Sequence, residues 1–309
     1  YQPESNVEVS MNSLLPQHRE VLNDITVDVQ AIVDNHMAQQ NLWYPSELLP
    51  ALGDFKRHDL PPELASGLVL NLLTEDGLPY FLALLVAHLG DEGPLFTWSK
   101  IWTAEEDRHG AAIKMYLHRT LRRDQLIRVE KMQANYLSSG FWPEWSKDPY
   151  RLLAYVVLQE RATQYSHAAI ARKAASVDPV LRTMMSKIAG DESRHHDAYV
   201  GMFRALMVRN PSHAVDAFYR VVKNFAMPGA SVPGFEELSI IQDRTGMFGA
   251  REFGDIIVEA TDKLNFWSLT GLDERAENAR DSIDKTIKLL RRVSERSAKQ
   301  AKRTLQINF

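Results

Sequence analysis

Two short segments combine carboxylates and imidazoles at a spacing that a metal ion could use. Glu106 lies three residues before His109 in "AEEDRHG", and Glu192 lies three residues before His195 in "GDESRHHD". On a helix, a separation of three residues puts both side chains on one face, about one turn apart. Apolar residues share that face, and an unpaired buried carboxylate would be very costly there. The spacing therefore predicts that both segments bind metal inside helices that are otherwise core.

Each pair also has a lone glutamate upstream, at nearly the same distance. Glu75 lies 31 residues before Glu106, and Glu160 lies 32 residues before Glu192. One Glu-x-x-His pair occurs often by chance, but two pairs that each follow a lone glutamate match the ligand set of ferritin-like carboxylate bundles with two iron or manganese ions. The predicted metal ligands are Glu75, Glu106, His109, Glu160, Glu192 and His195.

Neighbouring side chains could compete for the same metal ions. Glu105 lies four residues before His109, and His196 lies four residues after Glu192. The internal repeat favours Glu106 and His195 as ligands, so the other two point about 100° away around their helices. We expect Glu105 and His196 to contact the ligands rather than the metal ions, or to lie in solvent. Asp191 is a candidate hydrogen-bond acceptor for a metal-bound imidazole, which usually needs one.

The elements that carry these residues are predicted to be helices. Apolar residues recur at three- and four-residue spacing along most of the chain, and strand-like alternation is scarce. The expected fold is all-α, a ferritin-like four-helix core with additional flanking helices in a single domain over residues 1–309. Helices are expected at 13–38, 62–90, 95–119, 124–138, 148–176, 178–208, 212–226, 250–266 and 271–303.

Composition restricts the chemistry further. The chain has 309 residues and no cysteine, which excludes disulfides and thiolate ligands and leaves histidine and carboxylates to bind metal. Its net charge of −4 gives no sign of general nucleic-acid binding. No run of about 18 uncharged apolar residues occurs, so no membrane span is expected. No signal peptide is visible at the start.

The order of these motifs resembles that of a known family, the soluble acyl-acyl carrier protein desaturases of plastids and actinobacteria. The segments "LTEDGLPYF", "WTAEEDRHG", "LQERATQYSHAAIARKA" and "IAGDESRHHDAY" are similar to its four metal-binding helices. "LWYPSELLP", "NFAMPGASVPGFEE" and "TGLDERAENARD" resemble further family segments, so the resemblance covers roughly residues 13–300.

The resemblance implies a homodimeric enzyme with two iron ions. Such an enzyme uses O₂ and two electrons from ferredoxin to insert a cis double bond into an acyl chain on acyl carrier protein. Glu106 and Glu192 would bridge the irons, with Glu75 and Glu160 as terminal ligands. Thr163 matches a threonine implicated in proton handling, and Trp43, Asp191 and His109 match a path for electrons from the surface. For Trp43, a partly buried anchor is an equal alternative.

The resemblance also implies a cytoplasmic enzyme in a bacterium, or a plastid stromal enzyme in a plant. The acyl chain also needs a cavity beside the metal ions. The candidates to line it are apolar or aromatic residues, with ordinary core packing as the alternative: Leu78, Phe81, Leu82, Leu85, Tyr155, Val156 and Met184.

An acidic carrier protein requires a basic docking surface. The predicted carrier patch follows the first Glu-x-x-His motif and consists of Lys114, Arg119, Arg122, Arg123, Arg128 and Lys131. A solvated face without a partner is the alternative. The C-terminal cluster is a rival site for carrier or reductant: Arg291, Arg292, Arg296, Lys299, Lys302 and Arg303.

Two other functions remain open at this stage. An oxidase with the same metals could hydroxylate a carrier-bound intermediate, and the sequence separates this poorly from desaturation. A non-catalytic ferritin-like metal-binding protein is a poorer match, because storage predicts a shorter chain. Manganese could replace iron, since both metals accept these ligands.

Overall fold

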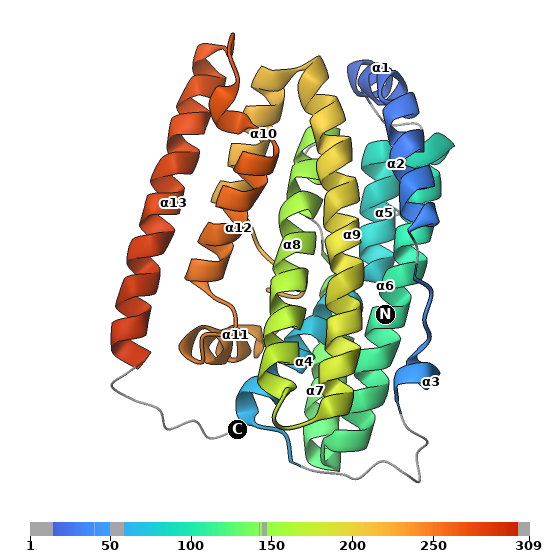
Figure 1. Cartoon of the computed structure of the whole chain (residues 1–309), viewed down its shortest axis with the longest axis vertical. Coiled ribbons are helices and arrows are strands. Elements are labelled where there is room, and N and C mark those ends of the chain that lie inside the picture. Colours follow the sequence, from blue (N-terminus) through green and yellow to red (C-terminus); the bar gives the residue numbers. More distant parts are fainter. Residues whose placement is uncertain (1–14, 40, 50–58, 142, 144–146, 302–309) are drawn as a thin grey trace.

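The computed structural model describes residues 15–39, 41–49, 59–141, 143 and 147–301. Helices dominate these residues and no strand occurs among them, which confirms the predicted all-α class (Figure 1). The elements are α1 (Pro16–Asp24), α2 (Thr26–Ala38), α3 (Pro45–Leu48), α4 (Pro62–Glu75), α5 (Leu78–Leu89), α6 (Gly93–Thr120), α7 (Arg123–Ser139), α8 (Pro149–Ala174), α9 (Pro179–Arg209), α10 (Pro211–Lys223), α11 (Phe235–Arg244), α12 (Ala250–Lys263), the 3-10 helix η1 (Phe266–Ser268) and α13 (Glu274–Ala301).

Helix starts follow from local chemistry. Helices α8, α9 and α10 each begin with a proline, whose fixed φ suits the first helical position and whose missing N–H costs nothing there. The residue before each proline caps the helix: the side chains of Asp148, Asp178 and Asn210 accept hydrogen bonds from backbone N–H groups of the first turn. These starts lie within one residue of the predicted ones.

The region predicted as one helix over 62–90 is two helices. Helix α4 ends at Glu75, α5 begins at Leu78, and the pair is bent by 43°. Pro79 explains the break, because it offers no N–H to the Glu75 carbonyl and its ring clashes with that carbonyl. The bend leaves the Glu75 side chain at the last position of its helix.

Other boundaries also differ from the prediction. The helix expected over 13–38 is divided at Ile25 into α1 and α2, and no residue type at this position accounts for the division. The short helix α3 was not predicted. Helix α11 begins within 227–237, a stretch that its prolines and glycines made resemble a loop.

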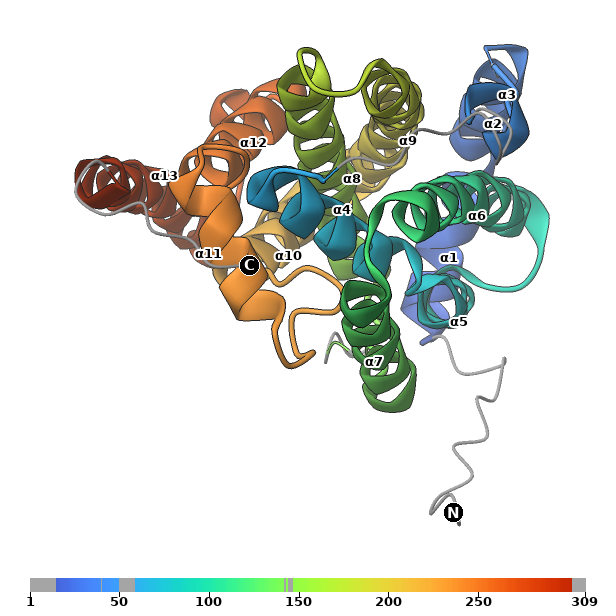
Figure 2. The same ribbon diagram turned by 90° about the horizontal axis from the view of Figure 1, so that it is seen from below.

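Four helices form the centre of the molecule. Helices α8 and α9 pack along each other, α6 packs against α9 and α4, and α4 also contacts α8. Helix α2 covers α6 and α9, whereas α10 and α12 cover α8 (Figures 1 and 2). Helix α13 lies outermost, against α10 and α12, and α11 packs against α4. The predicted four-helix core with flanking helices is therefore present.

The buried apolar side chains form two clusters, one toward each end of the central helices. On α8, residues 150–162 contribute to one cluster and residues 169–174 to the other. On α9, residues 181–188 and 198–207 divide in the same way. Between the clusters lies a layer of buried carboxylates and imidazoles. Apolar packing on both sides thus holds this polar layer near the middle of the bundle.

Among the described residues, no single helix is long and apolar enough to cross a membrane. Helices α4 and α5 reach that length and composition only when taken together across their bend.

Candidate metal centre

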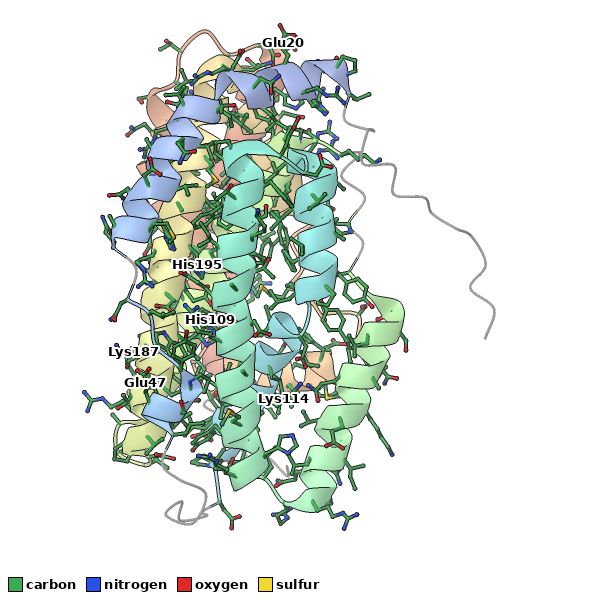
Figure 3. The ribbon with its side chains drawn as sticks, turned by 90° about the vertical axis from the view of Figure 1, so that its right-hand side faces the viewer. Glu20, Glu47, His109, Lys114, Lys187 and His195 are labelled. Atoms are coloured by element: carbon green, nitrogen blue, oxygen red, sulfur yellow. The ribbon has the colours of Figure 1, made fainter. Side chains whose placement is uncertain are left out.

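The six predicted ligands meet in this polar layer. Glu75 comes from α4, Glu160 from α8, and the two Glu-x-x-His pairs from α6 and α9. All six side chains are buried, with at most 4% of any residue exposed. In Figure 3, His195 lies above His109 near mid-height of the long helices. The helical repeat read from the sequence thus brings four helices to one place.

The donor atoms fall into two groups with shared members. Oxygen and nitrogen atoms of Glu75, Glu106, His109 and Glu192 lie within 4.8 Å of one another. A second group, within the same limit, takes Glu160 and His195 in place of Glu75 and His109. Glu106 and Glu192 belong to both groups. Two neighbouring metal positions with two carboxylates between them would produce this pattern.

The hydrogen bonding of these side chains fits a metal centre. Buried oxygens of Glu75, Glu160 and Glu192 have no hydrogen-bond partner, and neither does Oε1 of Glu106. Nδ1 of His195 lies 2.8 Å from that Glu106 oxygen but outside hydrogen-bond geometry. Buried polar atoms without partners are rare and costly. Carboxylate and imidazole donors suit iron and manganese, so the residues fit such ions.

Protons are distributed unevenly among the six side chains. Burial raises the pKa of Glu75 to about 8 and that of Glu160 well above its usual value. Burial alone would lower the pKa of His109 and His195, but the Glu106 carboxylate raises both well above the usual histidine value. Metal binding would have to displace protons from these groups.

The two central carboxylates show the opposite shift. Burial acts to raise the pKa of Glu106 and of Glu192. The attraction of His109 and His195 outweighs it for Glu106, and the neighbouring imidazoles of His109, His167 and His195 outweigh it for Glu192, so both pKa values are lowered. The carboxylates common to both groups are therefore the ones most readily ionised.

Each of the two histidines predicted as ligands turns its second nitrogen to a carboxylate on the opposite helix. Nε2 of His109 on α6 lies 3.2 Å from Oδ2 of Asp191 on α9. Nε2 of His195 on α9 lies 2.7 Å from Oε2 of Glu105 on α6. Asp191 therefore accepts from an imidazole as the sequence predicted, and Glu105 lies outside both four-residue donor groups while still supporting His195. Such bonds fix the ring, and Nδ1 would then face a bound metal ion.

Trp43, Asp191 and His109 form a continuous contact. The Trp43 indole donates to Oδ2 of Asp191 at 2.8 Å and stacks on the His109 ring, with ring centroids 6.1 Å apart. Arg194 donates to the other Asp191 oxygen at 2.6 Å. Trp43 itself is buried, and its role as an anchor or in an electron path stays a prediction.

Thr163 lies beside the centre on α8. Its hydroxyl is buried and donates to the backbone oxygen of Glu160 at 2.9 Å. The expectation for His196 was wrong in part. His196 is buried in the core, not solvated, and its Nδ1 lies 2.9 Å from the Val157 carbonyl. Burial lowers the His196 pKa to about 4, so this ring is neutral.

The sequence reading missed two histidines that lie at the centre. His36 on α2 has Nε2 3.3 Å from each Glu105 oxygen. His167 on α8 has Nε2 3.3 Å from an oxygen of Glu75 and 3.3 Å from one of Glu192. His167 could have been found, because it follows Glu160 by seven residues, two helical turns along the same face. His36 carried no such signal, since no predicted ligand lies on its helix.

A pocket with a volume of about 590 Å³ opens between α8, α10 and the segment after α7, and Tyr155 and Phe141 are among its lining residues. Phe81 stacks on both of these rings and also contacts Trp102, with centroids 5.8 Å apart. The Trp102 indole donates to Glu160 at 3.1 Å. Aromatic side chains therefore connect the pocket wall to the polar layer that contains the predicted ligands.

The residues predicted to line the acyl cavity lie in different parts of the structure. Tyr155 lines the pocket, and Phe81 stacks on Tyr155. Met184 belongs to the apolar cluster that does not contain Tyr155, and this position favours the alternative of core packing.

The predicted carrier patch lies on the surface. Arg122, Arg123, Arg128 and Lys131 are exposed on and just before α7, and Arg119 is partly buried at the end of α6. Lys114 of α6, labelled in Figure 3, pairs with Asp76 at 3.6 Å. Of the rival cluster, Arg291, Arg292 and Arg296 are exposed on α13. Lys302 and Arg303 lie outside the described residues, as does the side chain of Lys299.

Comparison with known proteins gives consistent matches. A model of the fatty acid desaturase family matches residues 17–309. The chain is 32% identical over 268 residues to stearoyl-[acyl-carrier-protein] 9-desaturase 6 of Arabidopsis thaliana, covering 81% of this chain and 68% of that protein. It is 31% identical over 287 residues to palmitoyl-[acyl-carrier-protein] 4-desaturase 3 of Ophrys sphegodes, covering 84% and 72%. Both relatives are chloroplastic.

Among solved structures, the chain is similar to DesA2 of Mycobacterium tuberculosis, which is described as an acyl-ACP desaturase. The TM-score is 0.60, the identity is 17%, and the match covers 84% of this chain and 99% of that one. At this identity the likeness concerns the fold, and it confirms the predicted ferritin-like architecture.

Proposed function

The chain belongs to the fatty acid desaturase family, and on that premise we propose that it introduces a cis double bond into an acyl chain carried on acyl carrier protein. The observation that carries the proposal is the pair of buried donor groups that share Glu106 and Glu192. The relatives named above act on stearoyl and palmitoyl chains on that carrier, which supports the substrate class.

We propose that two iron ions occupy the centre, held by the six predicted ligands, with manganese as the alternative. Glu106 and Glu192 would contact both ions, Glu75 and His109 one, and Glu160 and His195 the other. When bound, the ions supply the oxidising power, drawn from O₂, that removal of hydrogen from an unactivated CH₂ group requires. Two hydrogen atoms leave the acyl chain, ferredoxin supplies two electrons, solvent supplies two protons, and two molecules of water form.

The protein's own residues have distinct tasks in this proposal. Trp43 and Asp191 pass electrons toward His109, because they are in continuous contact with it. Thr163 holds a proton at its hydroxyl next to Glu160. The two apolar clusters above and below the centre exclude water from it.

The pocket at Tyr155 and Phe141 is proposed to admit the acyl chain. Tyr155 precedes Glu160 by five residues on α8, which is about 7.5 Å along the helix axis. Phe81 stacks on Tyr155 and contacts Trp102, whose indole donates to Glu160. The carrier would dock on the basic patch of α7, whose Lys131 lies about 14 Å along the axis from Gly140 at the pocket. The ferredoxin donor, the homodimer and the location in the cell remain predictions.

Product analysis tests the proposal directly. Iron-loaded protein is incubated with stearoyl and palmitoyl carrier protein, ferredoxin, its reductase and O₂, and the released acyl chains are examined by mass spectrometry. Loss of two hydrogen atoms supports desaturation, whereas gain of an oxygen atom indicates the hydroxylase alternative. No turnover would count against both enzymes. Asp107→Ala is the matched control, because Asp107 lies between Glu106 and His109 but is exposed.

A further inference from the structure

Each of the two ligand histidines is held by a small set of side chains, and the two sets are similar but differ in one member. Asp191 directly precedes Glu192 and holds His109, whereas Glu105 directly precedes Glu106 and holds His195. An arginine three residues after each carboxylate lies near it: Arg194 at 2.6 Å from Asp191 and Arg108 at 3.9 Å from Glu105. The two sets of side chains are therefore related by an approximate twofold repeat of α6 and α9.

The two sets differ in the side chain that contacts the carboxylate from outside α6 and α9. Asp191 receives the indole N–H of Trp43, and Glu105 receives Nε2 of His36 from α2. Both groups are buried, so neither contact is an exposed ion pair. His36 is itself held by Trp98, whose ring it meets edge-on with centroids 4.9 Å apart.

We infer that His36 is a positioning residue, which holds Glu105 so that His195 presents Nδ1 to one of the two metal ions. This inference rests on the proposed two-metal centre. Glu105 is fully buried, and a buried carboxylate is stable only when its oxygens are satisfied. His195 contacts Oε2 at 2.7 Å, and His36 contacts Oε1 at 3.3 Å from another helix. Without His36, Glu105 has lost that partner and the bond that orients His195 is weakened.

The effect must be confined to one ion. Of the two four-residue groups, His195 belongs only to the one with Glu160, and His109 only to the one with Glu75. Loss of the His36 contact therefore weakens the ion on the His195 side and leaves the ion on the His109 side in place. Loss of the Trp43 contact must do the reverse. A purely structural role for His36 would disturb the whole bundle and would not distinguish the two ions.

Titration of the metal-free chain with Co²⁺, followed by visible absorption, measures each binding constant without relying on turnover. His36→Leu is expected to keep one ion at wild-type affinity and to weaken the other by about 10- to 100-fold. His36→Gln, which retains an N–H donor, is expected to recover most of that loss. Trp43→Phe should weaken the other ion. Asn35→Ala, an exposed neighbour on the same helix, is the control and should change neither constant.

Glu105→Gln covers the case that His36→Leu does not fold, because it keeps the side-chain shape and should give the same selective loss. Equal weakening of both ions, no weakening of either, or failure of His36→Gln to recover affinity would overturn the inference. A third ion in the wild type that His36→Leu abolishes would also overturn it, since His36, Glu105 and His195 would then be ligands. If the wild type binds no pair of ions, the proposed function fails first.

Discussion

Glu106 on α6 and Glu192 on α9 are the two carboxylates that belong to both donor groups of the centre. Each lies one helical turn before a histidine that belongs to only one of these two groups of four residues. This difference between shared and unshared residues makes the ligand set testable one residue at a time.

Replacement of a shared carboxylate should cost more than replacement of an unshared one. Glu106→Ala is expected to abolish binding of both ions, whereas Glu75→Ala should weaken mainly the ion on the His109 side. Anaerobic Fe²⁺ titration with measurement of bound iron distinguishes these results. Asp107→Ala should bind two ions as the wild type does. Retention of two tightly bound ions by Glu106→Ala would refute the assignment.

His167 should support the centre without being a ligand. The Ser166 hydroxyl donates to Oδ1 of Asn71 at 2.8 Å, which directs the Asn71 amide N–H to Nδ1 of His167 at 3.0 Å. Nε2 of His167 then carries the hydrogen that faces Glu75 and Glu192. His167→Ala should keep two bound ions with affinity reduced about tenfold, as measured by Co²⁺ titration. Loss of one ion altogether would make His167 a ligand.

The metal-free protein should lose stability as the pH rises. The folded chain raises the pKa of Glu75 to about 8 from 4.5 and raises those of His109 and His195, so it binds more protons than the unfolded chain. Their stabilising contribution is complete below the unfolded pKa values and disappears as the pH rises through the folded ones. Glu106 and Glu192 have lowered pKa values and act only in the acid range.

Thermal unfolding at about pH 6 and about pH 8 measures this effect. We expect the midpoint of the metal-free protein to fall between these values and the increase produced by anaerobic Fe²⁺ to be larger at the higher pH, because metal competes with protons for the same atoms. An increase that is larger at the lower pH would contradict the assigned proton distribution.

The basic surface of α7 should act through association with the carrier. Replacing Arg122, Arg123 and Arg128 by glutamine should raise KM for the carrier-bound substrate by roughly 1.5- to 5-fold per arginine at low salt, with little change in kcat. The increase should shrink as salt is added. The matched control replaces Arg291, Arg292 and Arg296 on α13. A rise in KM in that variant alone would move the docking site to the rival cluster.

Helical periodicity and ligand spacing were sufficient to predict the all-α class, most helix positions and a cluster of two Glu-x-x-His pairs with two lone glutamates. These features are local, because one helix turn decides which side chains share a face. Pro79 also acts locally, and its effect on the helix that ends at Glu75 could have been predicted from the sequence.

Only the tertiary structure decided which groups surround the ligands. His36 lies 69 residues from Glu105, and Trp43 lies 148 residues from Asp191, so no spacing rule connects them. The packing of α2 and α3 on α6 and α9 brings these side chains to the centre. Helix periodicity fixes the direction in which a residue points along its own helix. The partner it meets depends on how separate helices pack, and that depends on apolar contacts spread over the whole chain.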